Sequence, residues 1–140
     1  MLFLSQIRKS GVLFVAIYLG DIDIELYRRF FPDIHTSEVV ITDERMQHVK
    51  EGHPEVTDAD FLYLPKVITC PDYIFSDPAP NTVRLMKSFY ESGKCFRAVV
   101  KISICEDNKD YKNSVLTFIS ISEKRYNRYV RKDTILFTNL

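Results

Sequence analysis

The second half of the chain is a series of β-branched and aromatic segments, and their order constrains the fold more than any other feature. Residues 82–90, 96–105 and 115–121 have the composition of strands, and a Ser-Gly-Lys turn signal at residues 92–94 separates the first two. Strands that follow one another through short turns pair antiparallel, so these segments predict a meander. Helical patterns come earlier in the chain, and helices followed by antiparallel strands predict an α+β fold rather than an alternating α/β fold.

Helices and short strands are expected over the rest of the chain. Helical patterns fall at residues 21–31, 43–52, 58–64 and 122–131. Thr42 and Ser122 are the expected N-caps of the helices that follow them, and Pro65 is expected to end the third helix. Further strands are expected at residues 5–9, 12–19, 38–41, 72–76 and 134–137.

Composition is ordinary for a globular protein, with 46% hydrophobic and 27% charged residues among 140. A chain of this length fits one domain and buries enough surface to need no disulfide or metal. The chain has three cysteines, at Cys70, Cys95 and Cys105. An odd number without a CxxC pair indicates free thiols in a reducing cytoplasm. The apolar run at residues 12–19 is too short to cross a bilayer and precedes acidic residues instead of a cleavage site, so no membrane association is expected.

Charge is unevenly distributed along the chain although the net charge is zero. Residues 1–83 hold 13 acidic and 7 basic side chains, whereas residues 84–140 hold 6 acidic and 12 basic ones. A basic half is what a phosphate-binding face requires. The alternative is that the two halves interleave in the fold, in which case the asymmetry disappears.

The densest group of chemically active side chains lies at residues 45–54. Arg45 and His48 are three residues apart on one helical face, and His53 follows the helix end. A histidine can accept and donate a proton near neutral pH, and an arginine can hold a phosphate. Alternatively, these residues only cap, pack and form ion pairs. Zinc is not expected, because a helical histidine pair requires i, i+4 spacing and no clear third ligand is near, and no other cofactor is expected.

The later strands and the tail add polar candidates. Lys101 lies within an apolar strand, where a cation serves either phosphate contact or edge protection. Asn113, Ser114 and Thr117 lie at the start of the next strand and in it, where a hydroxyl is commonly just a strand former. Residues 124–132 interleave cations with tyrosines, which suits phosphates and stacked bases or, equally, a solvated helix. The tail candidates for substrate binding are Arg125, Tyr126 and Arg128.

Several short motifs occur in an order that resembles a known nuclease superfamily. They are "VVIT", "DERMQHVKEGHPE", "PKVITCPDYIF", "DPAPN", "RAVVKISI" and "NSVLTFISIS" with a basic tail. The arrangement resembles the phage-associated branch of the barnase–EndoU–colicin–RelE-like (BECR-fold) nucleases. The resemblance covers about residues 39–137 and makes residues 1–38 an N-terminal extension of a single domain spanning residues 1–140.

The resemblance implies N-terminal helices packed on a twisted antiparallel sheet and a metal-independent RNase that cleaves by attack of the ribose 2′-hydroxyl. It places the site on the sheet face beside the histidine helix, where His48 transfers protons with His53 or Thr117 assisting. Arg45 and Lys101 would stabilise charge on the phosphate. Flanking nucleotides would contact the tail candidates together with Asn113 and Ser114. The implied partners are RNA, with tRNA a candidate, and an antitoxin or immunity protein.

Two other functions remain open from the sequence. One is a catalytically inactive module of phage or mobile-element origin that binds RNA or a protein. The other is a structural protein that assembles through aromatic surfaces. A metal-dependent DNA nuclease is less expected, because the sequence contains no evident acidic metal-binding group.

Overall fold

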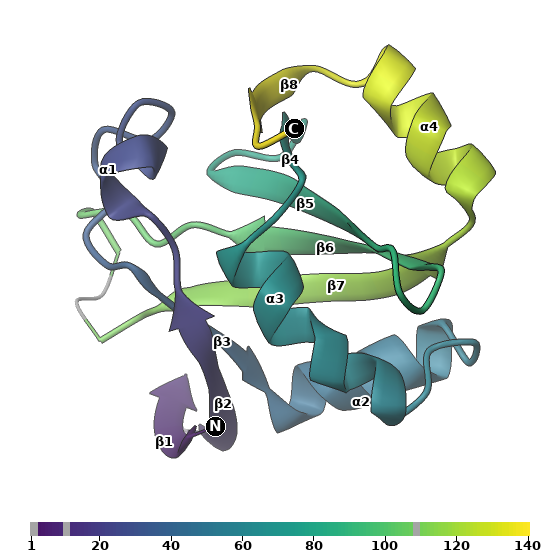
Figure 1. The fold of residues 1–140 in the computed structure, drawn as a ribbon. Helices are drawn as coiled ribbons and strands as arrows, with labels where there is room; N and C mark the ends of the chain where they lie inside the picture. The colour runs from purple at the N-terminus through teal and green to yellow at the C-terminus, as the bar shows by residue number, and fades with distance from the viewer. Residues whose placement is uncertain (1–2, 10–11, 108–109) are drawn as a thin grey trace.

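The computed structural model describes residues 3–9, 12–107 and 110–140, with side chains from residue 15 onward in those ranges. The described strands form one eight-stranded sheet in the order β1-β2-β3-β7-β6-β5-β4-β8 (Figure 1). With the helices that cover it, the sheet forms an α+β fold, as predicted. The strands are β1 (Phe3–Lys9), β2 (Val12–Asp21), β3 (Glu38–Thr42), β4 (Tyr73–Ser76), β5 (Thr82–Phe89), β6 (Lys94–Lys101), β7 (Asn113–Ile121) and β8 (Ile135–Thr138).

The strands of the second half pair as the predicted meander. β5 pairs antiparallel with β6, and β6 pairs antiparallel with β7. Gly93, in the turn between β5 and β6, has a φ of 71°, a left-handed conformation that glycine adopts without steric cost. The expectation of a purely antiparallel sheet is wrong at one place, because β3 runs parallel to β7 with Val39 opposite Asn113. A long connection with its own helices joins these two strands, so no short turn fixes their relative direction.

The N-terminal segment is built into the sheet. β2 lies between β1 and β3, and Ile17 of β2 is opposite Ile41 of β3. Leu19 and Ile22 are buried in the same hydrophobic cluster as Ile41. Leu19 and Ile22 therefore share one core with residues of β3 and β7.

The helices are α1 (Ile24–Tyr27), α2 (Asp43–Gly52), the 3-10 helix η1 (Ala59–Tyr63), α3 (Leu64–Thr69) and α4 (Glu123–Lys132). The predicted caps are confirmed, because Thr42 accepts a hydrogen bond from the Arg45 amide and Ser122 accepts one from the Arg125 amide. The predicted helix at residues 21–31 is only one turn long. The prediction that Pro65 ends a helix is wrong, since Pro65 lies in the first turn of α3, where its missing N–H has no helical partner to lose.

Helices cover both faces of the sheet (Figure 1). Adjacent residues of a strand point to opposite faces, and Phe118 and Ile119 of β7 belong to different clusters. On the first face, Phe118 packs with Phe61 and Phe96 beneath α1, α2, η1 and α3, at ring-centroid distances of 5.5 Å and 5.0 Å. On the second face, Ile119 packs beneath α4 with Tyr126.

None of the helices in the described ranges has the length and apolarity needed to cross a membrane.

Candidate nucleic-acid interface

A group of cations lies on the second face of the sheet, beneath and on α4. Arg97 of β6 is opposite Met86 of β5 and Ile119 of β7, both of which pack under α4. Arg84 of β5 is opposite Phe75, which belongs to the same cluster. We call this surface the basic face and define it by Arg84, Arg97, Lys101, Arg125 and Tyr129.

Arg97 is the central residue of the basic face. Its guanidinium carbon lies 5.0 Å from the centroid of the Tyr129 ring. Among the described residues, no group accepts a hydrogen bond from its buried Nε. Burial lowers the pKa of Arg97; Tyr129 and Asp133 act against this shift, whereas the positive charges of Arg84 and Arg125 add to it. The side chain stays protonated, because an arginine side chain is always charged in proteins. The fold therefore holds a partly desolvated cation that lacks a full set of partners.

Arg125 and Tyr129 extend the basic face along α4. They are four residues apart on one side of the helix, and Arg125 donates a hydrogen bond of 2.6 Å to the Tyr129 hydroxyl. The Arg125 guanidinium carbon also lies 5.6 Å from the Tyr129 ring centroid. The phenol ring therefore has one guanidinium near it from the helix and one from the sheet. All five basic residues of α4 are exposed, and Glu123 is its single acidic residue.

Arg84 differs from Arg97 because its charge is matched within the protein. Its Nε donates to Asp77 at 2.7 Å and its terminal nitrogen donates to Asp133 at 3.1 Å. Burial acts to lower the pKa of Arg84, but the two carboxylates outweigh burial and raise it. This ion-pair network links the turn after β4 to the end of α4, so Arg84 supports the position of α4 beside Arg97.

Lys101 and Thr117, predicted as catalytic residues, lie on the second face. Lys101 ends β6, about 13 Å along the strand from Arg97, and donates a hydrogen bond of 3.1 Å to the carbonyl oxygen of Pro80. Thr117 is opposite Val99 at a bulge in β7. Ser114, predicted to bind substrate, is opposite Lys101. Ser114 and Thr117 therefore lie on the same face of the sheet as Lys101 and extend the basic face across β7.

The predicted histidine site lies on the first face instead. α2 packs on β2, β3 and β7, and its Val49 belongs to the first-face core. His48 is exposed, with its Nε2 3.5 Å from Glu44, and His53 caps the helix end, with its Nδ1 3.5 Å from Glu55. Arg45 lies one turn before His48. The sheet therefore lies between the helix that carries the histidines and the face that carries Lys101 and Thr117, so the structure does not place the two groups on one face of the sheet.

Two residues predicted to bind substrate have roles inside the fold. Tyr126 is 9% exposed and its hydroxyl donates a 2.9 Å hydrogen bond to Asp72, so its ring is not available for base stacking. Asn113 is fully buried: its amide oxygen accepts from the Ser103 amide, and its amide nitrogen donates to the Thr36 carbonyl. Arg128, by contrast, is exposed on α4 as a phosphate contact requires.

The remaining histidine belongs to the same internal network. The Nε2 atom of His35 lies 2.7 Å from the Ser103 hydroxyl, and Ser103 is 3% exposed. The backbone amide of His35 donates to the Ser103 carbonyl. This pair therefore ties the loop after α1 to the segment after β6. Within the described residues, no three His, Cys, Asp or Glu side chains come together in a group that could hold a metal ion.

Sequence reasoning missed Arg84, Arg97 and Tyr129. The two arginines carried the same signal as Lys101, because each lies between apolar residues of a strand, such as Phe96 and Ala98. Strand alternation shows that such a cation points away from the apolar side. It does not show that a helix from later in the chain brings Tyr129 over Arg97.

Comparisons with known proteins give no family for this chain: no family model, no curated protein and no solved structure matches it.

Proposed function

We propose that the protein binds single-stranded RNA through the basic face. The observation that carries this proposal is Arg97, whose partly desolvated guanidinium has a buried Nε without an acceptor in the described part of the chain. The guanidinium as a whole has lost part of its hydration, and the ion pairs of the described residues do not include it, so an incoming anion gains more beside it than at a solvated cation. The exposed cations of α4 supply further phosphate contacts, and the part of the Tyr129 ring that the two guanidiniums leave uncovered supplies a surface for a base.

The choice of RNA over other polyanions rests on the resemblance of the motifs to the BECR-fold nucleases. On the same resemblance, we propose that the helices pack on the sheet in a barnase-like arrangement. Cations combined with an aromatic ring suit single strands, whose bases can leave the stack and lie on a side chain. A duplex would contact mainly the cations, so Tyr129 would contribute little to the affinity for a duplex.

Binding is tested by fluorescence anisotropy with a labelled single-stranded RNA over a range of salt concentrations. Arg97→Gln should weaken binding about tenfold and reduce the slope of log K against log salt by about 0.7, the value for one phosphate on a single strand. Arg29→Gln is the matched control, because Arg29 is exposed and lies in the segment after α1. Equal losses of RNA affinity in both variants would show that only the net charge of the protein matters, and this result would contradict the proposal.

RNA cleavage is a second candidate function, favoured by the contacts of Tyr129. Its hydroxyl accepts a hydrogen bond from Arg125 beside the Arg97 guanidinium, and a phenol can transfer protons. In this arrangement Tyr129 would act as the proton-transfer group and Arg97 would stabilise charge on the phosphate.

Cleavage is measured by incubating total RNA and tRNA with the protein in EDTA. Tyr129→Phe should abolish cleavage and retain binding, whereas His48→Ala should retain both. Loss of cleavage in His48→Ala alone would instead assign the chemistry to the first face, as the sequence motifs predict. Binding without cleavage in the wild type would leave the binding function as the activity.

A further inference from the structure

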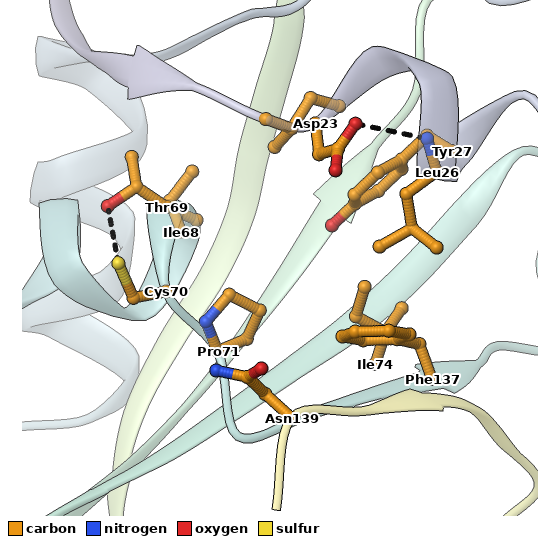
Figure 2. A pocket seen from close by; sticks show the side chains of 11 residues that line it. Asp23, Leu26, Tyr27, Ile68, Thr69, Cys70, Pro71, Ile74, Phe137 and Asn139 are labelled. Carbon is orange, nitrogen blue, oxygen red and sulfur yellow. Dashed lines mark hydrogen bonds between the residues drawn. The ribbon is translucent and has the colours of Figure 1, made fainter.

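A pocket of about 220 Å³ opens on the first face, away from α4 and the basic face. It lies between α1, the end of α3, β4 and the C-terminal segment that includes β8 (Figure 2). Most of its lining is apolar and includes Leu26, Ile68, Pro71, Ile74 and Phe137. An apolar cavity of about 150 Å³ can hold benzene, so this pocket is large enough for a substituted ring.

The Tyr27 hydroxyl is an unpaired polar group in this pocket. Tyr27 is 2% exposed, and no group in the described part of the chain forms a hydrogen bond with its hydroxyl. Figure 2 shows the ring extending from α1 with the hydroxyl directed into the space bounded by Ile68, Pro71 and Ile74. The hydroxyl has almost no solvent-accessible surface, so an occupant reaches it only after a small shift of a side chain in the pocket wall. A buried hydroxyl without a partner is unfavourable, and this missing hydrogen bond favours the shift.

The surrounding charges define which occupant fits. Burial and the negative charge of Asp23 raise the pKa of Tyr27, so the hydroxyl keeps its proton and can donate it in a hydrogen bond. Asp23 also lines the pocket and disfavours an anion there. The Thr69 hydroxyl already donates to the Pro65 carbonyl, which leaves Asn139 as the main additional polar side chain.

We propose that this pocket binds a small, neutral, mainly apolar molecule whose carbonyl oxygen accepts a hydrogen bond from Tyr27. The expected class is an aromatic or branched ketone or amide. Binding of this kind is independent of the basic face, because the sheet lies between the two. A water molecule would satisfy Tyr27 but would find few other polar partners among the apolar side chains.

The test is a double-mutant cycle between protein and probe, read by NMR chemical-shift titration. The probes are acetophenone and isopropylbenzene, which have similar shapes and differ in the carbonyl. The wild type should bind acetophenone, with shifts at the amides around the pocket. Tyr27→Phe should weaken acetophenone binding about tenfold and leave isopropylbenzene binding unchanged, since the lost energy belongs to the hydroxyl–carbonyl pair.

The matched control is Tyr90→Phe, because Tyr90 is 98% exposed and outside the pocket. It should change neither affinity. A wild type that shows no pocket shifts with acetophenone up to its solubility would overturn the proposal without the use of any variant. Equal binding of acetophenone by wild type and Tyr27→Phe would overturn the role of the hydroxyl. Tyr27→Phe should fold, because the change removes a group without a partner.

Discussion

Two arginines on neighbouring strands, Arg84 and Arg97, differ in the charges that surround them, and Arg97 is also the more buried of the two. Arg84 is paired with Asp77 and Asp133, whereas Arg97 lies near cations and has a buried Nε without an acceptor in the described chain. The first arrangement is complete in the free protein. The second leaves a cation without a carboxylate partner among the described ion pairs, which is why Arg97 is the central residue of the proposed binding face.

This contrast predicts opposite stability changes for the same substitution. Arg97→Met should raise the free energy of unfolding by about 1 kcal/mol, because it removes an incompletely paired cation and keeps apolar contact with Tyr129. Arg84→Met should lower it by about 1–3 kcal/mol, because Asp77 and Asp133 lose their partner. Urea unfolding of both variants measures the difference. Destabilisation of Arg97→Met would show that Arg97 is a structural residue.

Asp60 makes stability depend on pH on the acid side. It is 3% exposed, accepts a 2.8 Å hydrogen bond from Lys94 and accepts another from the Thr57 amide. Burial acts to raise the pKa of Asp60, but the hydrogen bonds and the charge of Lys94 lower it overall. The folded pKa is thus below the unfolded value of about 3.9, so the stabilisation is complete above that pH and is lost as pH falls through the folded pKa.

Asp60→Asn should therefore lower stability at neutral pH and reduce the further loss that occurs on going to acid. Urea unfolding at neutral pH and below about pH 3 measures both quantities. Asp33→Asn serves as the control because Asp33 is exposed, and it should retain the wild-type acid dependence. An unchanged acid dependence in Asp60→Asn would assign that dependence to other carboxylates.

Among the elements, the contact between β2 and α3 depends on a single glycine. Gly20 lies at a bulge in β2 with a φ of 137°, and a Cβ at this position would lie 2.6 Å from the Cγ2 atom of Thr69. Gly20→Ala should lower the free energy of unfolding by about 1–3 kcal/mol, because backbone strain and the clash both oppose it. Thermal or urea unfolding measures the loss.

A second change separates the two causes. Thr69→Ser removes the Cγ2 atom, so Gly20→Ala should cost less in that background, and the remaining loss should report the backbone strain. Gly52→Ala is the control at the end of α2, where a Cβ would meet no atom within 4 Å. It should leave stability equal or slightly higher, since alanine is the better helix former. An equal cost of Gly20→Ala in both backgrounds would exclude the clash with Thr69.

Elements that depend on nearby residues could be predicted from the sequence, whereas elements that depend on distant parts of the chain could not. The caps at Thr42 and Ser122 were predictable because each involves an amide only three residues away. The turn at Gly93 was predictable for the same reason. The role of Pro65 was not predictable, because a proline can either begin or end a helix and the neighbouring residues do not distinguish the two. The parallel pairing of β3 with β7 depends on the path of residues 43–112, which no local pattern encodes.

At the scale of the whole molecule, the acidic and basic halves of the chain do not interleave completely. α1, α2, η1 and α3 all come from the acidic half and cover the first face, whereas α4 comes from the basic half and covers the second. The charge asymmetry was compatible with a phosphate-binding face or with interleaved halves, and it did not indicate which side chains would lie together. Lys101 and Thr117 were placed beside His48 because the order of motifs does not reveal which side of the sheet each one faces.

This two-sided distribution predicts that position, rather than net charge, controls RNA binding. Arg128→Glu on α4 and Arg29→Glu after α1 change the net charge equally, and both arginines are exposed. At 0.1 M salt the screening length is about 10 Å, so a charge on the other side of the sheet acts weakly on bound phosphate. Arg128→Glu should therefore weaken binding about tenfold, and Arg29→Glu less than about twofold. Anisotropy titrations at two salt concentrations make the comparison, and equal losses would mean that RNA responds to the net charge of the whole protein and that a cation on α4 has no special role.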